Sequence, residues 1–149
     1  MIRRSVPVLM GSKPPRRIPN PLFLHASEKA PQSTDVDFSQ LSLKYPVANP
    51  NPAFTIPRFG WAPKSATTPN YPFFVARSGQ NENLPVFTDF KNGRTKVITI
   101  VQKISGNVDE LRADMEKVVG KPVEIKSGKL IVHGNFHLRL KKYLLALGF

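Results

Sequence analysis

Cysteine is absent from the 149-residue sequence, which excludes disulfides, thiolate metal ligands and cysteine nucleophiles. Long apolar runs are absent too. None approaches the roughly 18 residues of a membrane-spanning helix, so we expect no membrane span. Acidic residues are few, ten against 22 lysines and arginines, and the formal net charge is +12. Such an excess favours a polyanionic partner, either nucleic acid or an anionic membrane surface.

Proline is nearly missing from the C-terminal part. Fourteen of the 15 prolines lie within residues 1–85, and only Pro122 follows. Because proline fixes φ and removes a backbone donor, this density excludes long helices and central strands there. We therefore divide the chain into an extended basic Pro-rich arm without a core of its own (1–71), a joint segment (72–83) and a small folded domain (84–149).

The first 27 residues carry five cations and no acid. This charge pattern resembles an organellar transit peptide, although five prolines would break its amphipathic helix. The alternative is a basic arm that lies on nucleic acid, and both interpretations hold together if the segment is retained. The candidate RNA contacts in this segment are Arg3, Arg4, Lys13, Arg16 and Arg17.

The rest of the arm mixes aromatic and basic residues with proline. Residues 38–43 alternate apolar and polar, which predicts one short strand. Residues 46–72 hold seven prolines, typical of extended chain. Its aromatics suit either stacking on bases or filling pockets of a neighbouring protein, and both uses stay open. For the basic residues of this segment we favour contacts to phosphate groups. The candidate RNA contacts here are Arg58, Phe59, Trp61 and Lys64, followed by Arg77 in the joint segment.

The C-terminal 66 residues predict an α+β fold in the order β-β-α-β-β-α. A strand over 84–90 leads through Asn92-Gly93 into a strand over 95–104. Asn107 begins a helix that Gly120 and Pro122 end. A second hairpin turns at Ser127-Gly128, and a last helix follows with Asn135 as its cap. We expect a small two-layer sandwich, with both helices on one face of a four-stranded sheet and the other face free for a partner.

The charged residues of the two helices are expected on solvated faces. The last helix buries an apolar stripe that includes Leu140, Leu144 and Leu147. Its opposite side carries Arg139, Lys141 and Lys142, which form either a phosphate-binding patch or an ordinary solvated face. Asp114 and Glu116 are likewise expected on a solvated face of the first helix.

No catalytic constellation is visible. His133 and His137 are four positions apart and start a helix, but no cysteine and no H-E-x-x-H pattern accompanies them. We expect no metal site, no cofactor and no small-molecule substrate, so the chain is not predicted to be an enzyme.

Several short segments, in their order and spacing, resemble a known family. They are Phe73-Phe74-Val75-x-Arg77, Asn83 to Asp89, Ile100-x-x-Lys103-Ile104-x-Gly106, Asp109-Glu110-Leu111-Arg112, Val132-x-Gly134-x-Phe136 and Leu147-Gly148-Phe149. Together they cover about residues 72–149 and resemble the family of mitochondrial large-subunit ribosomal protein number 49. Residues 1–71 carry no such resemblance.

The resemblance implies a domain similar to the SUI1 fold of translation initiation factors. It also implies a structural role in the large subunit of the mitochondrial ribosome, in the matrix, with ribosomal RNA and neighbouring ribosomal proteins as partners. The alternative is a free SUI1-like translation factor that binds the ribosome transiently.

Overall fold

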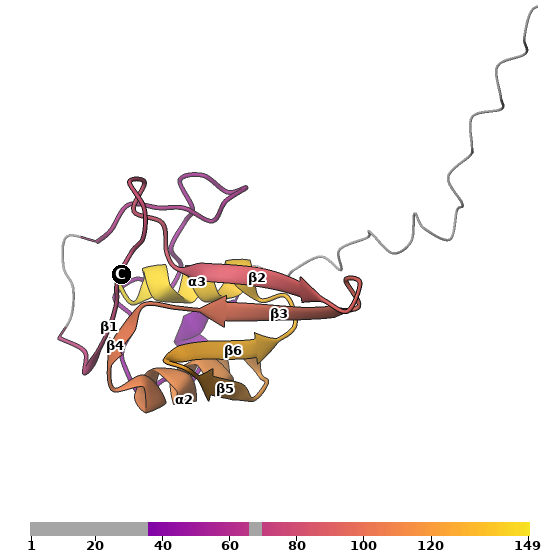
Figure 1. Ribbon diagram of the computed structural model, residues 1–149. Coiled ribbons are helices and arrows are strands. Elements are labelled where there is room, and N and C mark those ends of the chain that lie inside the picture. The colour runs from indigo at the N-terminus through magenta and orange to yellow at the C-terminus, as the bar shows by residue number, and fades with distance from the viewer. Residues whose placement is uncertain (1–35, 66–69) are drawn as a thin grey trace, which may run out of the picture. The chain divides into compact units, whose positions relative to one another are not determined.

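A four-stranded antiparallel sheet forms one layer of the computed structural model (Figure 1). The structure describes residues 36–65 and 70–149, which lie in one compact unit, Gln32–Phe149. The strand order is β2-β3-β6-β5, and all neighbouring strands are antiparallel. The strands are β2 (Val86–Lys91), β3 (Lys96–Val101), β5 (Val123–Lys126) and β6 (Lys129–His133).

The two predicted hairpins are confirmed. Ser127 and Gly128 have φ of 52° and 70° and join Lys126 directly to its partner Lys129. Two consecutive positive φ angles match the strand twist, and glycine adopts them at no steric cost. The β2–β3 hairpin also turns at Asn92-Gly93, within a four-residue loop.

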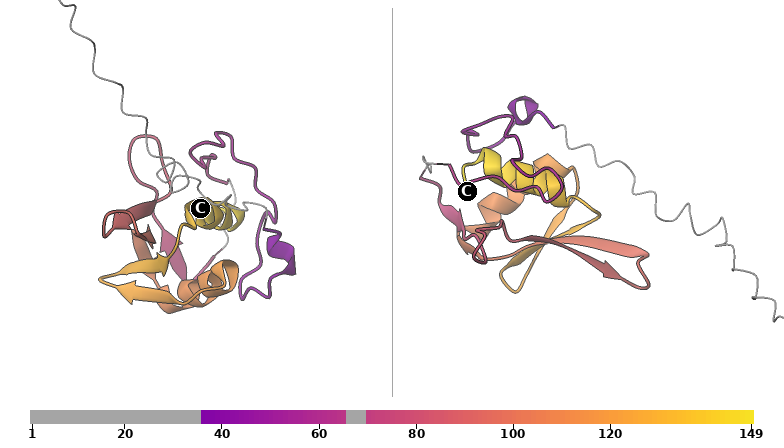
Figure 2. Two further views of the ribbon diagram at one scale, coloured as in Figure 1. Left: turned by 90° about the vertical axis from the view of Figure 1, so that its right-hand side faces the viewer. Right: turned by 90° about the horizontal axis from the view of Figure 1, so that it is seen from above.

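Two helices, α2 (Val108–Val119) and α3 (His137–Ala146), complete the second layer (Figure 2). They contact one another, while α2 packs on β5 and α3 on β2. The predicted apolar stripes are buried. Leu111, Met115 and Val118 of α2 are at most 1% exposed, and Leu140 and Leu144 of α3 are equally enclosed. These stripes and the sheet's inner face make the core.

Helix α3 begins differently from the prediction. Its N-cap is Phe136, not Asn135, and no side chain of the cap residue bonds to the helix. Thr99 in β3 takes this role instead. Its hydroxyl accepts from the Phe136 amide (3.0 Å) and donates to the Gly134 carbonyl (2.7 Å). The first turn of α3 is therefore fixed by the sheet below it. For α2 the N-cap residue is Asn107 as predicted, again without a side-chain bond to the helix backbone.

The predicted strand over 95–104 is interrupted. Lys103 has a φ of 54°, and the Gln102 amide turns to the Pro85 carbonyl at 3.0 Å. After this break, β4 (Ile104–Gly106) leaves the main sheet. It pairs antiparallel with β1 (Phe73–Val75) in a second, two-stranded sheet. The joint segment therefore contributes to the core, where Phe73 and Val75 are at most 2% exposed.

The predicted strand over 38–43 is wrong. Residues Phe38–Gln40 form a 3-10 helix, η2, closed by local bonds to the carbonyls of Asp37 and Phe38. Among the described residues no strand pairs with this segment, so its backbone groups are satisfied locally instead. Phe38 is 1% exposed, and its ring centroid lies 5.8 Å from that of Tyr143 in α3. The segment is held by this anchor rather than by a sheet edge.

The predicted solvated side of α3 is covered. Lys141 and Lys142 are each only 8% exposed. Residues 36–65 pass over this side, as both views of Figure 2 show. The Asn49 amide bonds to the Ala146 carbonyl at 3.1 Å, and the Lys141 ammonium bonds to the Phe59 carbonyl at 2.7 Å. The expected basic face on α3 is therefore an internal contact.

The expected solvation of Asp114 is wrong, while Glu116 is partly exposed as expected. Asp114 is fully buried, accepts the Lys44 amide at 3.0 Å and pairs with Lys117 at 3.5 Å. Glu116 accepts the Val123 amide at 3.0 Å, and this bond, opposed by partial desolvation, lowers the pKa of its carboxyl. Both acids bond to backbone amides outside their own helix, which sequence periodicity does not reveal.

Candidate nucleic-acid interface

A tight turn over Ile56–Trp61 carries three of the predicted RNA contacts. The amides and carbonyls of Ile56 and Trp61 bond to one another in both directions, at 3.1 and 3.3 Å. Pro57 presets the turn, and Gly60 accepts a φ of 62°. A Cβ on Gly60 would also lie 3.0 Å from the Leu138 side chain. The turn therefore packs closely on α3 and points its tip outward.

Two further bonds fix this turn on the domain. The Trp61 indole donates to the Asn81 carbonyl at 2.9 Å, across 20 positions of sequence. The Lys141 ammonium donates to the Phe59 carbonyl at 2.7 Å. Burial lowers the pKa of the Lys141 ammonium. The turn is thus tied both to the loop before β2 and to α3.

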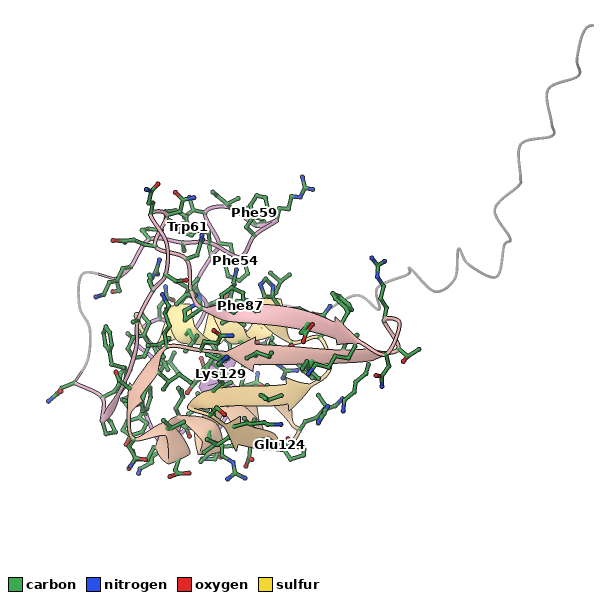
Figure 3. All side chains as sticks on the ribbon, in the orientation of Figure 1. Phe54, Phe59, Trp61, Phe87, Glu124 and Lys129 are labelled. Carbon is green, nitrogen blue, oxygen red and sulfur yellow. The ribbon has the colours of Figure 1, made fainter. Side chains whose placement is uncertain are left out.

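A groove of about 720 Å³ lies between the turn, the start of β2 and the start of α3. Buried Leu84 and Val86 form its apolar part. Exposed aromatics stand at its edge, with Phe59 at 59% and Phe87 at 47% exposure. Figure 3 shows Phe59 and Trp61 on the turn, with Phe87 of β2 beneath them. The groove therefore offers flat apolar surfaces that solvent reaches.

The charges around the groove are of one sign. Among the described residues, its lining includes Arg58 and Lys141 but no carboxylate. The Arg58 guanidinium lies 5.6 Å from the centre of the Phe59 ring. His137 lines the groove as well, and burial, then the charge of Lys141, lower the pKa of its imidazole to about 4, against the effect of a bond to the Val86 backbone. This imidazole is neutral at physiological pH, and because one nitrogen bonds to the Val86 backbone, the other is left to accept.

Arg77 serves the fold. Its guanidinium donates to three backbone oxygens: those of Ala62 (2.8 Å), Glu82 (3.0 Å) and Phe149 (2.7 Å). Partial burial lowers its pKa, an effect that the charge of Glu82 opposes. These bonds connect the arm, the loop before β2 and the residue after α3. The position is better explained by this connection than by a phosphate contact.

The remaining predicted contacts are dispersed. Lys64 is exposed, and its ammonium lies 5.8 Å from the centre of the Phe74 ring. Arg139 is partly buried, and desolvation lowers its pKa. Lys141 and Lys142 are enclosed as described above. The five cations of the first 27 residues lie outside the described residues. These five predicted RNA contacts are Arg3, Arg4, Lys13, Arg16 and Arg17.

The histidines hold no metal-like arrangement in the described part of the chain. His133 lies on the outer face of the sheet, 3.5 Å from the Glu124 carboxylate, while His137 lines the groove. Within residues 36–65 and 70–149, no three His, Asp or Glu side chains gather as metal ligands. In the same residues, no helix is long and apolar enough to cross a bilayer.

The sequence did not identify four polar or aromatic groove residues, Asn81, Asn83, Phe87 and His137. Phe87 gave a usable signal, because alternation along the strand places it on the opposite sheet face from apolar Val86. Asn81 gave none beyond a polar loop, and His137 was considered only as a metal ligand. These residues line one groove only because the Ile56–Trp61 turn packs on α3.

Comparison with known proteins gives matches over more than half of the chain. A family model described as "Mitochondrial large subunit ribosomal protein (Img2)" matches residues 71–149. The chain is similar to "Large ribosomal subunit protein mL49" of Neurospora crassa, at 34% identity over 96 residues. That match spans 60% of this chain and 58% of the relative.

The protein of the same name from Schizosaccharomyces pombe is 30% identical over 82 residues, which span 52% of this chain and 77% of that relative. The resemblance to the number 49 family is thereby confirmed. The chain belongs to the family of mitochondrial large-subunit ribosomal proteins described as Img2.

Proposed function

We propose that this chain is a structural constituent of the mitochondrial large ribosomal subunit, where it docks on ribosomal RNA and on neighbouring ribosomal proteins. The family match over residues 71–149 carries this proposal. It also makes the mitochondrion the place where the chain works. A structural role requires surfaces rather than a catalytic cleft.

The surface chemistry supports RNA as one partner. The formal charge of +12 draws the chain to phosphates. In the part that the structure describes, Arg58 and Phe59 project from the turn, Trp61 lines the groove beside them, and Lys64 is exposed nearby. The basic residues of the first 27 positions extend the proposed set. We leave Arg77, Lys141 and Lys142 out of it, because the chain itself engages or encloses them.

The outer face of the sheet supports protein neighbours as the other partner. Ile100 and Ile131 pair across β3 and β6 on this face, and both are only half-buried. Neighbouring ribosomal proteins would cover such an apolar row. The element order also supports a SUI1-like domain over 84–149, and residues 36–65 of the proposed arm pack onto it.

Sedimentation tests the proposal. A tagged chain from mitochondrial lysates is expected to comigrate with the large subunit and to stay there in moderate salt. Recovery only as free protein at low salt would contradict it. Salt-labile comigration that cycles with initiation would favour the transient translation factor.

A matched truncation separates the arm from the domain. Removing residues 1–35 leaves Phe38 and the Ile56–Trp61 turn in place. It should weaken incorporation without lowering the thermal midpoint. Removing residues 1–71 should destabilise the domain as well, because Phe38 belongs to the core.

A further inference from the structure

We infer that the groove beside the Ile56–Trp61 turn binds an unstacked nucleobase of single-stranded RNA, with Arg58 on its phosphate. This inference rests on the proposed function and names the chemistry of one contact. Four observations lead to it, and each concerns a different requirement of base binding.

The first requirement is a flat surface that is free to stack. Phe59 and Phe87 are 59% and 47% exposed at the groove edge, and Trp61 lies between the turn and the loop before β2. Every base has a π-face, so such side chains bind bases with little sequence preference. The cavity of about 720 Å³ has room for one nucleotide.

The second requirement is charge complementarity. Arg58 is the exposed cation of the groove lining, the Lys141 ammonium bonds internally to the Phe59 carbonyl, and no carboxylate from the described ranges lines the groove. Arg58 lies over one face of the Phe59 ring at 5.6 Å, which leaves the opposite face for a base and keeps a guanidinium beside it for the phosphate. A groove for an apolar peptide would gain nothing from such a cation at its edge.

The third requirement is polar groups for the base edges. Asn81, Asn83 and His137 line the same groove. Two amides and a neutral imidazole supply both donors and acceptors, as the Watson–Crick edge of a base needs. An A-form duplex hides these edges, so only an unpaired base can use them.

The fourth requirement is rigidity. The turn is closed on itself at Ile56 and Trp61, and it is tied to α3 through Lys141 and to residue 81 through the indole. The aromatics on it are therefore held in place before RNA arrives. Pre-positioned groups lose less entropy on binding.

Trp61 provides a direct test, because it is the only tryptophan in the chain. We expect a single-stranded oligouridylate of about eight nucleotides to quench its fluorescence. A duplex of equal length, and a single strand of equal charge without bases, should not quench it. Equal quenching by the duplex or by the base-free strand would overturn the inference.

Variants then locate the contact. Phe59→Ala and Phe87→Ala should each weaken single-strand binding by about 10-fold. Phe90→Ala is the matched control, because Phe90 is 51% exposed on the same strand as Phe87 and does not line the groove. Arg58→Gln should lower the slope of log K against log salt by about 0.7. Equal affinity of the Phe59 and Phe90 variants would overturn the inference.

Three further outcomes are decisive. If the groove variants bind RNA normally but lose a crosslink to a neighbouring ribosomal protein in large subunits, the groove is a protein pocket and the inference fails. If the unchanged chain comigrates with large subunits while the groove variants keep full RNA affinity, the inference fails and the proposed function stands. Absence of comigration would remove the proposed function whatever the groove binds.

Discussion

The side chain of Lys141 and the backbone of Phe59 are joined by a hydrogen bond of 2.7 Å that spans 82 positions of sequence. A cation on the last helix thus orients the turn that carries Arg58. While the Lys141 ammonium makes this bond, its stem packs against Gly60, where an added Cβ would lie 3.1 Å from it. The bond makes the turn part of the folded unit.

Replacing Lys141 by methionine keeps the stem and removes the charge. We expect a loss of about 2 kcal/mol in unfolding free energy, the usual scale for a bond from a charged donor. The pKa of His137 should rise, because the charge of Lys141 is one of the causes that lower it. An NMR titration of the His137 ring measures this. Lys129→Met, at an exposed position of β6, is the control and should leave that pKa unchanged.

His137 should make stability depend on pH. In the folded chain the pKa of its imidazole falls to about 4, below its ordinary 6.5, so the unfolded chain binds the extra proton between these values. Stability is therefore complete above about pH 6.5 and declines as pH falls toward 4. One proton gives at most about 1.4 kcal/mol per pH unit, and the exposed part of the ring reduces this. His137→Gln should flatten the decline in urea denaturation between these values. An unchanged slope would refute this role.

Arg77 holds three segments through backbone oxygens of Ala62, Glu82 and Phe149. Arg77→Gln should lower unfolding free energy by about 3 kcal/mol, because carbonyls that lose a charged donor stay partly buried. Arg94→Gln, at the exposed tip of the β2–β3 hairpin, removes the same charge and should cost less than about 0.5 kcal/mol. Guanidinium denaturation compares them. Equal losses would mean that Arg77 acts only through net charge.

Gly106 brings β4 against β1. Its φ is 86°, and a Cβ there would lie 2.3 Å from the Pro72 carbonyl oxygen. Gly79 has a similar φ of 79°, and no atom of the described residues lies within 4 Å of such a Cβ. Gly79→Ala should thus cost about 1–2 kcal/mol from the left-handed backbone alone. Gly106→Ala should cost at least about 3 kcal/mol, since backbone must also move. Similar thermal midpoints for the two variants would contradict the close approach.

Phe38 anchors residues 36–65 on α3. Phe38→Ala should lower unfolding free energy by about 3–5 kcal/mol, because the ring is 1% exposed and leaves a cavity. Phe90→Ala removes the same ring from an exposed position and should cost under about 1 kcal/mol. Proteolysis near residue 45 should accelerate in the first variant only. Equal stability would mean that the segment is not held by this residue.

Local features of the fold were predictable, because each depends on a few adjacent residues. Asn92-Gly93 and Ser127-Gly128 specify their turns through backbone conformation. The stripes of α2 and α3 follow from helical spacing. The cover over α3 was not predictable in this way. It requires Phe38, Asn49 and Phe59 to contact a helix about 100 positions away. Such long-range contacts produce no periodic pattern in the sequence.

The candidate site shows the same division. Arg58, Phe59 and Trp61 stand out in sequence as aromatic and basic residues between prolines. Arg77 and Lys141 stand out equally well by composition. Only the structure shows that their donors are taken up by backbone oxygens, because any carbonyl can accept and carbonyls leave no mark in sequence. The excess of basic residues therefore indicated a polyanionic partner. Packing determines which of these side chains stay exposed and able to contact it.

The two backbone bonds between Ile56 and Trp61 fix the shape of the turn before it meets a partner, and this affects the order in which the ribosomal subunit assembles. A turn that is already fixed cannot adapt its shape to a base-paired segment, so any ordering cost falls on the partner. On the inferred base-binding role, the RNA that docks here would have to be unpaired locally before the chain binds it. Incorporation of this chain should thus report that the RNA beside it has reached its final local fold.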